Sequence, residues 1–389
     1  MIGSMAAPQS LSPSSPIAQK ACADLPITPL LPSSRLSQLA GCQVFLKMEV
    51  LQTGGTHKIR GLLGYVADMV GLYGSDLHFV VGALPNMSIA CAAAVAHYNQ
   101  HRPTSCVTLS AVIPACSPPR FSQMLHTHGA KCIQFGQTWE QAKSHARMLV
   151  EKNQAQSIAS LVMPPEDIVS GLTSIGQEIK QQIRPHLNNT HIDAILCPVG
   201  SGALLASLAH EFNQRTSVVG VETASTDLFH TCLVQKKMVF RPRKSAHDSL
   251  SLSDSSLCCK AIEAAKTCPV IPVVISEAMA ANASLQFSED HHVLIEAASG
   301  AALSPIYHEL ISGLLPDLQP TSTIVVVVTG GNLASLSDFA RFAKHHSHPL
   351  IQAKSRDLFF LSLTPPSLIS EEEKIPLLPQ LPDLLLNSS

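Results

Sequence analysis

The chain has 389 residues, of which 46 % are hydrophobic and 14 % charged, and its formal net charge is −2. This length can bury a large core or build a two-lobed unit, and the balanced charge excludes the basic footprint of a protein that binds nucleic acid or an anionic membrane. The sequence shows no apolar run of membrane-spanning length, no secretory signal and no metal-type spacing among its eleven cysteines, so we expect reduced thiols in a cytoplasmic protein.

Short β-rich runs alternate with longer helical patterns along the chain. The predicted strands are Val44–Met48, His78–Ala83, Cys106–Ile113, Lys131–Phe135, Ala194–Val199, Val218–Glu222, Val270–Ile275, His292–Ile295 and Thr323–Thr329. The predicted helices are Ile89–His97, Trp139–Asn153, Ser174–Ile183, Ala203–Phe212, Ser256–Lys266 and Ser304–Leu314. This alternation indicates βαβ units, and therefore an α/β fold with mainly parallel sheets and helices on both faces.

The two ends of the chain have a different composition. Residues 1–24 are rich in Ala, Ser and Pro, which predicts a disordered leader. Residues 351–389 carry the acidic run Glu371–Glu373, followed by Pro and Leu repeats. This Pro/Leu-rich tail is either a poorly ordered extension or a clamp on another surface.

One lysine, Lys58, follows a Gly-rich turn. A short apolar strand runs into Gln52–His57, and the turn delivers Lys58 at the start of a helical pattern. A lysine amine becomes a nucleophile when desolvation or nearby cations lower its pKa, and it can then hold an aldehyde cofactor as a Schiff base. By itself, the same pattern more often indicates a solvated charge.

Three further loops follow predicted strands, where ligands of open parallel sheets bind. Asn86 either caps the next helix or turns its amide toward a ligand. The loop Gly200–Leu204 either cradles a phosphate with its N–H groups and the next helix dipole, or is a plain tight connection. Thr329 precedes two glycines, and its hydroxyl either meets a ring nitrogen or belongs to a simple turn.

Two carboxylates, Glu222 and Glu296, also stand where predicted strands end. Each is either a metal ligand or a buried partner of backbone amides.

Many of these motifs are collinear with one family of enzymes. They are Thr28-Pro29-Leu30, Leu46-Lys47-Met48-Glu49, Gln52 through Gly61, Pro164-Pro165, Ser174-Ile175, Pro198 through Leu205, Val221-Glu222-Thr223, Ile295 through Ala302 and Gly330-Gly331. In this order they resemble the fold-type II pyridoxal-phosphate enzymes, which have a tryptophan synthase β-like fold. Among these, the chain is most similar to the L-serine/L-threonine dehydratases.

The resemblance implies a role for each matching residue. Lys58 would bind pyridoxal 5′-phosphate and move the substrate α-proton, Asn86 would hydrogen-bond the 3′-oxygen of the cofactor, and Thr329 would face its pyridine nitrogen. The backbone N–H groups of Gly200, Ser201, Gly202, Ala203 and Leu204 would surround the phosphate. Glu222 matches a site for a monovalent cation such as K⁺, and Thr56 lies with the residues that face the substrate.

The resemblance also implies an organisation. Residues 25–57 and 160–350 would form a large cofactor-binding domain, and residues 58–159 a small mobile domain. A small amino-acid substrate and a homodimer would follow, with no nucleic-acid or membrane partner.

The sequence departs from the family pattern at two places, the residue before Lys58 and the loop that would hold the substrate carboxylate. His57 replaces the usual aromatic residue before the lysine and is expected to stack on the ring or relay protons. The loop that holds the substrate carboxylate reads Ala83-Leu84-Pro85-Asn86, so Ala83 lacks a hydroxyl and Pro85 lacks an N–H. Each lost hydrogen bond to a carboxylate weakens binding by about 1.5–3 kcal/mol, which for two bonds corresponds to roughly 10²- to 10⁴-fold.

We therefore expect an ammonia-lyase of the serine/threonine dehydratase type, which eliminates the β-hydroxyl to give a 2-oxo acid and ammonia. Two alternatives stay open. One is β-replacement or racemisation of another β-substituted amino acid, and the other is a catalytically silent homologue.

Overall fold

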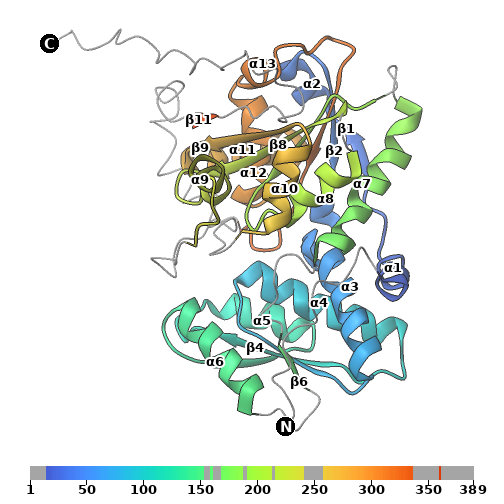
Figure 1. Ribbon diagram of the computed structural model, residues 1–389, viewed down its shortest axis with the longest axis vertical. Helices are drawn as coiled ribbons and strands as arrows, with labels where there is room; N and C mark the ends of the chain where they lie inside the picture. Colours follow the sequence, from blue (N-terminus) through green and yellow to red (C-terminus); the bar gives the residue numbers. More distant parts are fainter. Residues whose placement is uncertain are drawn as a thin grey trace, which may run out of the picture.

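The computed structural model describes residues 15–152, 158–160, 168–186, 191–212, 215–240, 257–335 and 359–360. These residues form two bodies, each built on its own sheet (Figure 1). Pro164-Pro165 and all of the predicted tail except residues 359–360 lie outside the described residues. The predicted α/β fold with mainly parallel sheets is confirmed.

The larger body contains a seven-stranded sheet in the order β1-β2-β10-β7-β8-β9-β11. Its strands are β1 (Leu30–Pro32), β2 (Gln43–Lys47), β10 (Thr323–Val327), β7 (Ala194–Pro198), β8 (Ser217–Thr223), β9 (Val270–Ile275) and β11 (Phe359–Phe360). The inner five are parallel, and the two edge strands β1 and β11 pair antiparallel. In β10, Ile324 and Val326 pack into one core while Val325 and Val327 pack into the other, as expected for a strand buried on both faces.

Helices cover both faces of this sheet. On one face lie α2 (Ser34–Ala40), α11 (Glu277–His291) and α12 (Ala297–Tyr307), followed by the short α13 (Ile311–Leu314). On the other face lie α7 (Val169–Ile183), α8 (Ala203–Phe212), α9 (Leu228–Gln235) and α10 (Cys259–Thr267).

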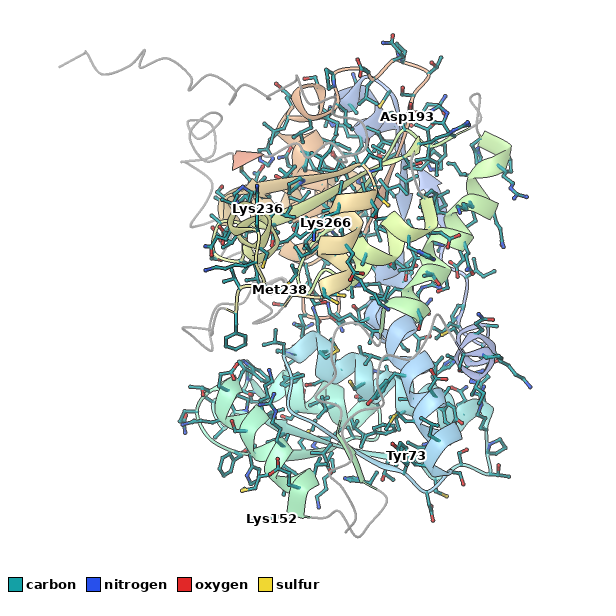
Figure 2. All side chains as sticks on the ribbon, in the orientation of Figure 1. Tyr73, Lys152, Asp193, Lys236, Met238 and Lys266 are labelled. Atoms are coloured by element: carbon teal, nitrogen blue, oxygen red, sulfur yellow. The ribbon has the colours of Figure 1, made fainter. Side chains whose placement is uncertain are left out.

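The smaller body contains four parallel strands in the order β5-β4-β3-β6. They are β5 (Lys131–Gln134), β4 (Thr108–Ile113), β3 (His78–Val81) and β6 (Ile158–Ser160). Helices α3 (Lys58–Tyr73), α4 (Pro85–His101) and α5 (Pro119–Thr127) cover one face, and α6 (Trp139–Lys152) covers the other through Ala142 and Ala146. In Figure 2, Tyr73 and Lys152 mark the ends of α3 and α6 in this body, whereas Lys236 and Lys266 lie on the larger one.

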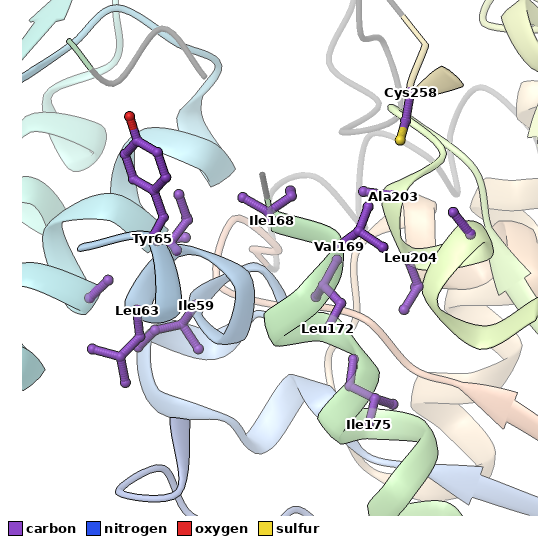
Figure 3. Packing of buried hydrophobic residues seen from close by; sticks show 14 of the residues in the cluster. Ile59, Leu63, Tyr65, Ile168, Val169, Leu172, Ile175, Ala203, Leu204 and Cys258 are labelled. Atoms are coloured by element: carbon purple, nitrogen blue, oxygen red, sulfur yellow. The ribbon is translucent and has the colours of Figure 1, made fainter. Parts of the chain in front are cut away.

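The two bodies meet where α3 packs against α7 (Figure 3). Two glycines make this contact possible: a Cβ on Gly171 would lie 2.3 Å from the Arg60 carbonyl oxygen, and one on Gly61 would lie 2.5 Å from the Ile168 Cβ. Any larger side chain would therefore separate the helices. Ile59 and Leu172 fill the space around the contact as part of a continuous core.

A buried charge cluster of Lys47, Glu49, Arg60 and Glu178 reinforces the same contact. The Arg60 guanidinium donates to both oxygens of Glu49 at 2.7 and 2.8 Å and to both oxygens of Glu178 at 2.7 and 2.9 Å. Lys47 Nζ donates to Glu178 Oε2 at 2.5 Å, so two cations face two carboxylates. Burial opposes the Arg60 charge, but the two carboxylates outweigh it and raise the pKa of Arg60.

The structure corrects several predicted boundaries. Residues 16–22 of the predicted disordered leader form helix α1 (Pro16–Cys22), whose Ser15 cap accepts a hydrogen bond from the Ala18 N–H at 3.1 Å. Residues 292–295 are not a strand but the connection into α12. The predicted helix Ser304–Leu314 is divided in two, because the chain leaves the helical conformation at Glu309 (φ +59°): its first four residues end α12 and its last four form α13.

Candidate active site

A cavity of about 40 Å³ lies at the carboxyl ends of the strands of the larger sheet. The residues that line it come from separate loops: Thr56, His57, Lys58, Asn86, Ile168, Leu172, Pro198, Gly200, Ser201, Gly202, Ala203, Leu204, Glu296, Ala298, Thr329 and Gly330. The structure thus brings together all the predicted site residues except Ala83, Leu84, Pro85 and Glu222.

Lys58 enters the cavity as the first residue of α3. The turn before it contains Gly54 at φ +73° and Gly55 at φ +67°, where a Cβ would lie 2.8 Å from Ala93 and Asn332 Cβ atoms respectively. Glycine is therefore required at both positions. Gln52 braces the turn by donating from Nε2 to the Pro26 carbonyl oxygen at 2.8 Å.

His57 binds the Thr329 carbonyl oxygen twice. Its main-chain N–H donates to that oxygen at 3.0 Å, and its Nδ1 lies 3.1 Å from the same atom. Burial, and then the charge of Lys58, hold the pKa of His57 well below its usual range. A neutral imidazole is therefore expected at neutral pH, which argues against a proton relay that depends on titration near pH 7.

The loop Gly200–Leu204 connects β7 to α8. Gly202 has φ +80°, and a Cβ there would lie 2.7 Å from the Ala261 Cβ, so only glycine fits. The Cys258 N–H donates to the Ser201 carbonyl oxygen at 2.7 Å and fixes the far side of the loop. Because the first N–H groups of a helix have no partner within the helix, the start of α8 offers donors and a positive dipole to an anion in the cavity.

Asn86 and Glu296 meet across the cavity. Asn86 Nδ2 donates to Glu296 Oε2 at 2.5 Å, and the Leu333 N–H donates to Glu296 Oε1 at 3.1 Å. Asn86 Oδ1 is buried and has no partner among the described residues. The sequence signalled Glu296 only as one of two carboxylates at strand ends, and its place in the cavity was missed.

Thr329 follows β10 of the larger sheet, and the Ser299 side chain of α12 contacts it. The two hydroxyl oxygens are 3.1 Å apart, and the buried Ser299 Oγ also accepts from the Gly330 N–H at 3.0 Å. Ser299 does not line the cavity. It lies within the motif Ile295 through Ala302, but no role was predicted for it.

Two groups of predicted residues lie elsewhere. Ala83, Leu84 and Pro85 precede or begin α4 outside the cavity lining, and Pro85 is the first residue of that helix. Both carboxylate oxygens of Glu222 accept main-chain N–H groups at the start of α9, from Phe229 at 2.7 Å and His230 at 2.8 Å. The described residues contain no cluster of three or more His, Cys, Asp or Glu side chains arranged to hold a metal ion.

Comparison with known proteins identifies the family. The family model described as "Pyridoxal-phosphate dependent enzyme" matches residues 24–330. The chain belongs to this family. Within the pyridoxal-phosphate-dependent family, it is 30 % identical over 313 residues to "Serine dehydratase-like" of Rattus norvegicus, covering 79 % of this chain and 90 % of that protein. It is also 30 % identical over 319 residues to the "L-serine dehydratase/L-threonine deaminase" of Mus musculus, covering 80 % and 92 %.

Solved structures of the family share the architecture. A fungal L-serine ammonia-lyase from Rhizomucor miehei superposes with a TM-score of 0.73 at 33 % identity, over 83 % of this chain and 99 % of that one. A pyridoxal 5′-phosphate-dependent aspartate racemase superposes with a TM-score of 0.67 at 20 % identity, over 81 % of this chain and 94 % of that one, which shows a common fold alone.

Among the described helices, none has the length and apolar character needed to cross a bilayer.

Proposed function

We propose that the chain is a pyridoxal-phosphate-dependent ammonia-lyase that converts L-serine or L-threonine into a 2-oxo acid and ammonia. The observation that carries this proposal is the convergence of Lys58, Asn86, the Gly200–Leu204 loop and Thr329 on one cavity. The names and identities of the relatives favour this reaction among those known for the family.

The residues of the cavity fit the cofactor on three counts. Lys58 supplies an amine at the cavity wall. Gly202 leaves no room for a Cβ, which keeps the loop main chain bare at the start of α8, as an anion site requires. Asn86 Oδ1 is a buried acceptor that still lacks a donor, and a ligand hydroxyl or N–H would satisfy it.

Each residue then has a defined task. When bound, pyridoxal phosphate supplies an electron sink for the substrate Cα. Lys58 Nζ would hold the cofactor and would act as the base that takes the α-proton of the substrate. The N–H groups of the Gly200–Leu204 loop would hold the phosphate, Thr329 would face the ring nitrogen, and Thr56 would face the substrate.

Hydride trapping tests the covalent step. Borohydride treatment of the purified protein with pyridoxal phosphate should leave a pyridoxyl group on the peptide that contains Lys58, as seen by mass spectrometry. Lys58→Ala should abolish both the adduct and the release of ammonia from L-serine, whereas Lys131→Ala, on the exposed edge of the smaller sheet, should change neither. A protein that acquires no adduct at Lys58 would refute the proposal.

The start of α4 favours a second candidate substrate class. Pro85 begins this helix and has no N–H, so one donor expected for an amino-acid carboxylate is absent. A β-substituted amino acid other than serine or threonine is the alternative. Ammonia release should be compared across a panel that contains L-serine, L-threonine and β-substituted alanines. Efficient turnover of L-serine would reject the alternative.

Three finer expectations stay predictions. A monovalent cation at Glu222 would have to share a carboxylate that already accepts two N–H groups, and activity in K⁺ compared with tetramethylammonium buffers tests it. Light scattering after gel filtration tests the homodimer. Cell fractionation tests the cytoplasmic location.

A further inference from the structure

The contact between His57 and Thr329 joins two parts of the cavity that are far apart in sequence. His57 precedes Lys58 directly, and Thr329 follows β10 of the larger sheet. Thr56 and Gly330 also form an antiparallel bridge beside this contact. The Gly331 N–H also donates to the Gly55 carbonyl oxygen at 3.2 Å, so the Lys58 turn is attached to the segment after β10 along three consecutive residues.

The acceptor in this contact determines which nitrogen of His57 carries the proton. A carbonyl oxygen can only accept hydrogen bonds, so an Nδ1 atom 3.1 Å away must be protonated to bind it. In a neutral imidazole the other nitrogen, Nε2, then has no proton. Only 8 % of His57 is exposed, and its burial supports the neutral form.

We propose that His57 is a positioning residue that holds Lys58 at a fixed distance from Thr329 by donating both its main-chain N–H and its Nδ1–H to the Thr329 carbonyl oxygen. This inference rests on the proposed function, because it matters only if Lys58 and Thr329 bind the same ligand. A Phe at this position would donate the first hydrogen bond but not the second. The imidazole therefore adds a restraint on the Lys58 turn that stacking cannot supply.

Two substitutions separate the hydrogen bond from the ring. Asn at position 57 keeps an N–H donor the same number of bonds from Cα as Nδ1 but loses the aromatic ring. Phe keeps a ring but loses the donor. The readout is the affinity of each apoprotein for pyridoxal phosphate, together with the visible circular dichroism of the bound cofactor, which reports whether it is held in one orientation.

His57→Asn should bind the cofactor within about twofold of the wild type and keep the dichroic band. His57→Phe should bind about tenfold more weakly, which is the value of one buried hydrogen bond, and lose most of the band. The reverse order, or an equal loss in both variants, would overturn the proposal.

A measurement without substitution or cofactor tests the same contact. In ¹⁵N-histidine-labelled apoprotein, assigned by comparison with His57→Asn, the His57 signals should show a protonated Nδ1 and an unprotonated Nε2 at neutral pH. The opposite tautomer would refute the proposal even if His57→Phe folds poorly. Since this measurement needs no cofactor, it stands whether or not hydride trapping finds the adduct at Lys58.

Discussion

Removing Arg60 from the buried charge cluster should destabilise the whole chain. Only 1 % of the Arg60 side chain and none of Glu49 is exposed, and Arg60 also donates to Ser174 Oγ at 3.2 Å. In Arg60→Met, Glu49 would keep the Thr28 hydroxyl as a hydrogen-bond donor but would lose its cation. Leaving a buried carboxylate uncompensated lowers the free energy of unfolding by about 3–5 kcal/mol.

Urea unfolding measures this loss by far-ultraviolet circular dichroism and by the fluorescence of Trp139, the only tryptophan in the chain. Arg35→Met is the matched control, because Arg35 is 51 % exposed and lies 3.7 Å from Asp290, so its loss should change the free energy by less than about 1 kcal/mol. Adding Glu49→Gln to Arg60→Met should recover at least ~1 kcal/mol relative to the sum of the single changes. If Arg60→Met is no less stable than Arg35→Met, the reasoning about the cluster is wrong.

Three further outcomes follow from the site. Gly202→Ala should lower the free energy of unfolding by about 1–2 kcal/mol, because φ at this position is +80° and Ala261 blocks the added Cβ. The same substitution should weaken cofactor binding in a fluorescence titration. Unchanged binding would show that this loop does not hold the phosphate. Ser299→Ala should lower the free energy of unfolding in urea by about 1–3 kcal/mol, because the buried Gly330 N–H loses its acceptor. A change below about 0.5 kcal/mol, which is usual for neutral substitutions, would contradict this. The free energy of unfolding should fall as the pH drops below about 6.5, because the unfolded chain binds a proton at His57 that the folded chain excludes. In His57→Asn the fall should be less steep, by at most ~1.4 kcal/mol per pH unit. Parallel pH profiles of the two proteins would exclude His57 as the cause.

The sequence predicted best what depends on local pattern. Strands such as β9 are continuous apolar runs, and the predicted range Val270–Ile275 is also the observed one. Helix α8 was likewise predicted with its observed ends, because a Gly-rich loop begins it and polar residues follow it. The segment His292–Ile295 failed because its apolar residues serve the entry to α12 rather than a sheet, and pairing with a distant strand cannot be seen locally.

The sequence predicted which loops form the site but not which side chains contact one another within it. Lys58 and Thr329 follow β2 and β10, whose parallel pairing brings their carboxyl ends to one edge, whereas Asn86 follows β3 of the smaller sheet. Glu296 and Ser299 were not assigned to the site because their roles depend on contacts with Asn86 and Gly330, which are distant in sequence. Glu222 was open between two interpretations, and its distances to the amides of α9 favour the one without a metal.

The close contact between α3 and α7 determines how far each end of α3 would move if the two bodies rotated relative to each other. Gly61, where α3 touches α7, is only about 4.5 Å along the helix axis from Lys58, whereas Tyr73 at the far end is about 18 Å away. If the smaller body rotates about Gly61, a 4 Å displacement of Tyr73 corresponds to a displacement of Lys58 by only about 1 Å. Such a rotation would therefore displace the Lys58 main chain far less than the far end of α3.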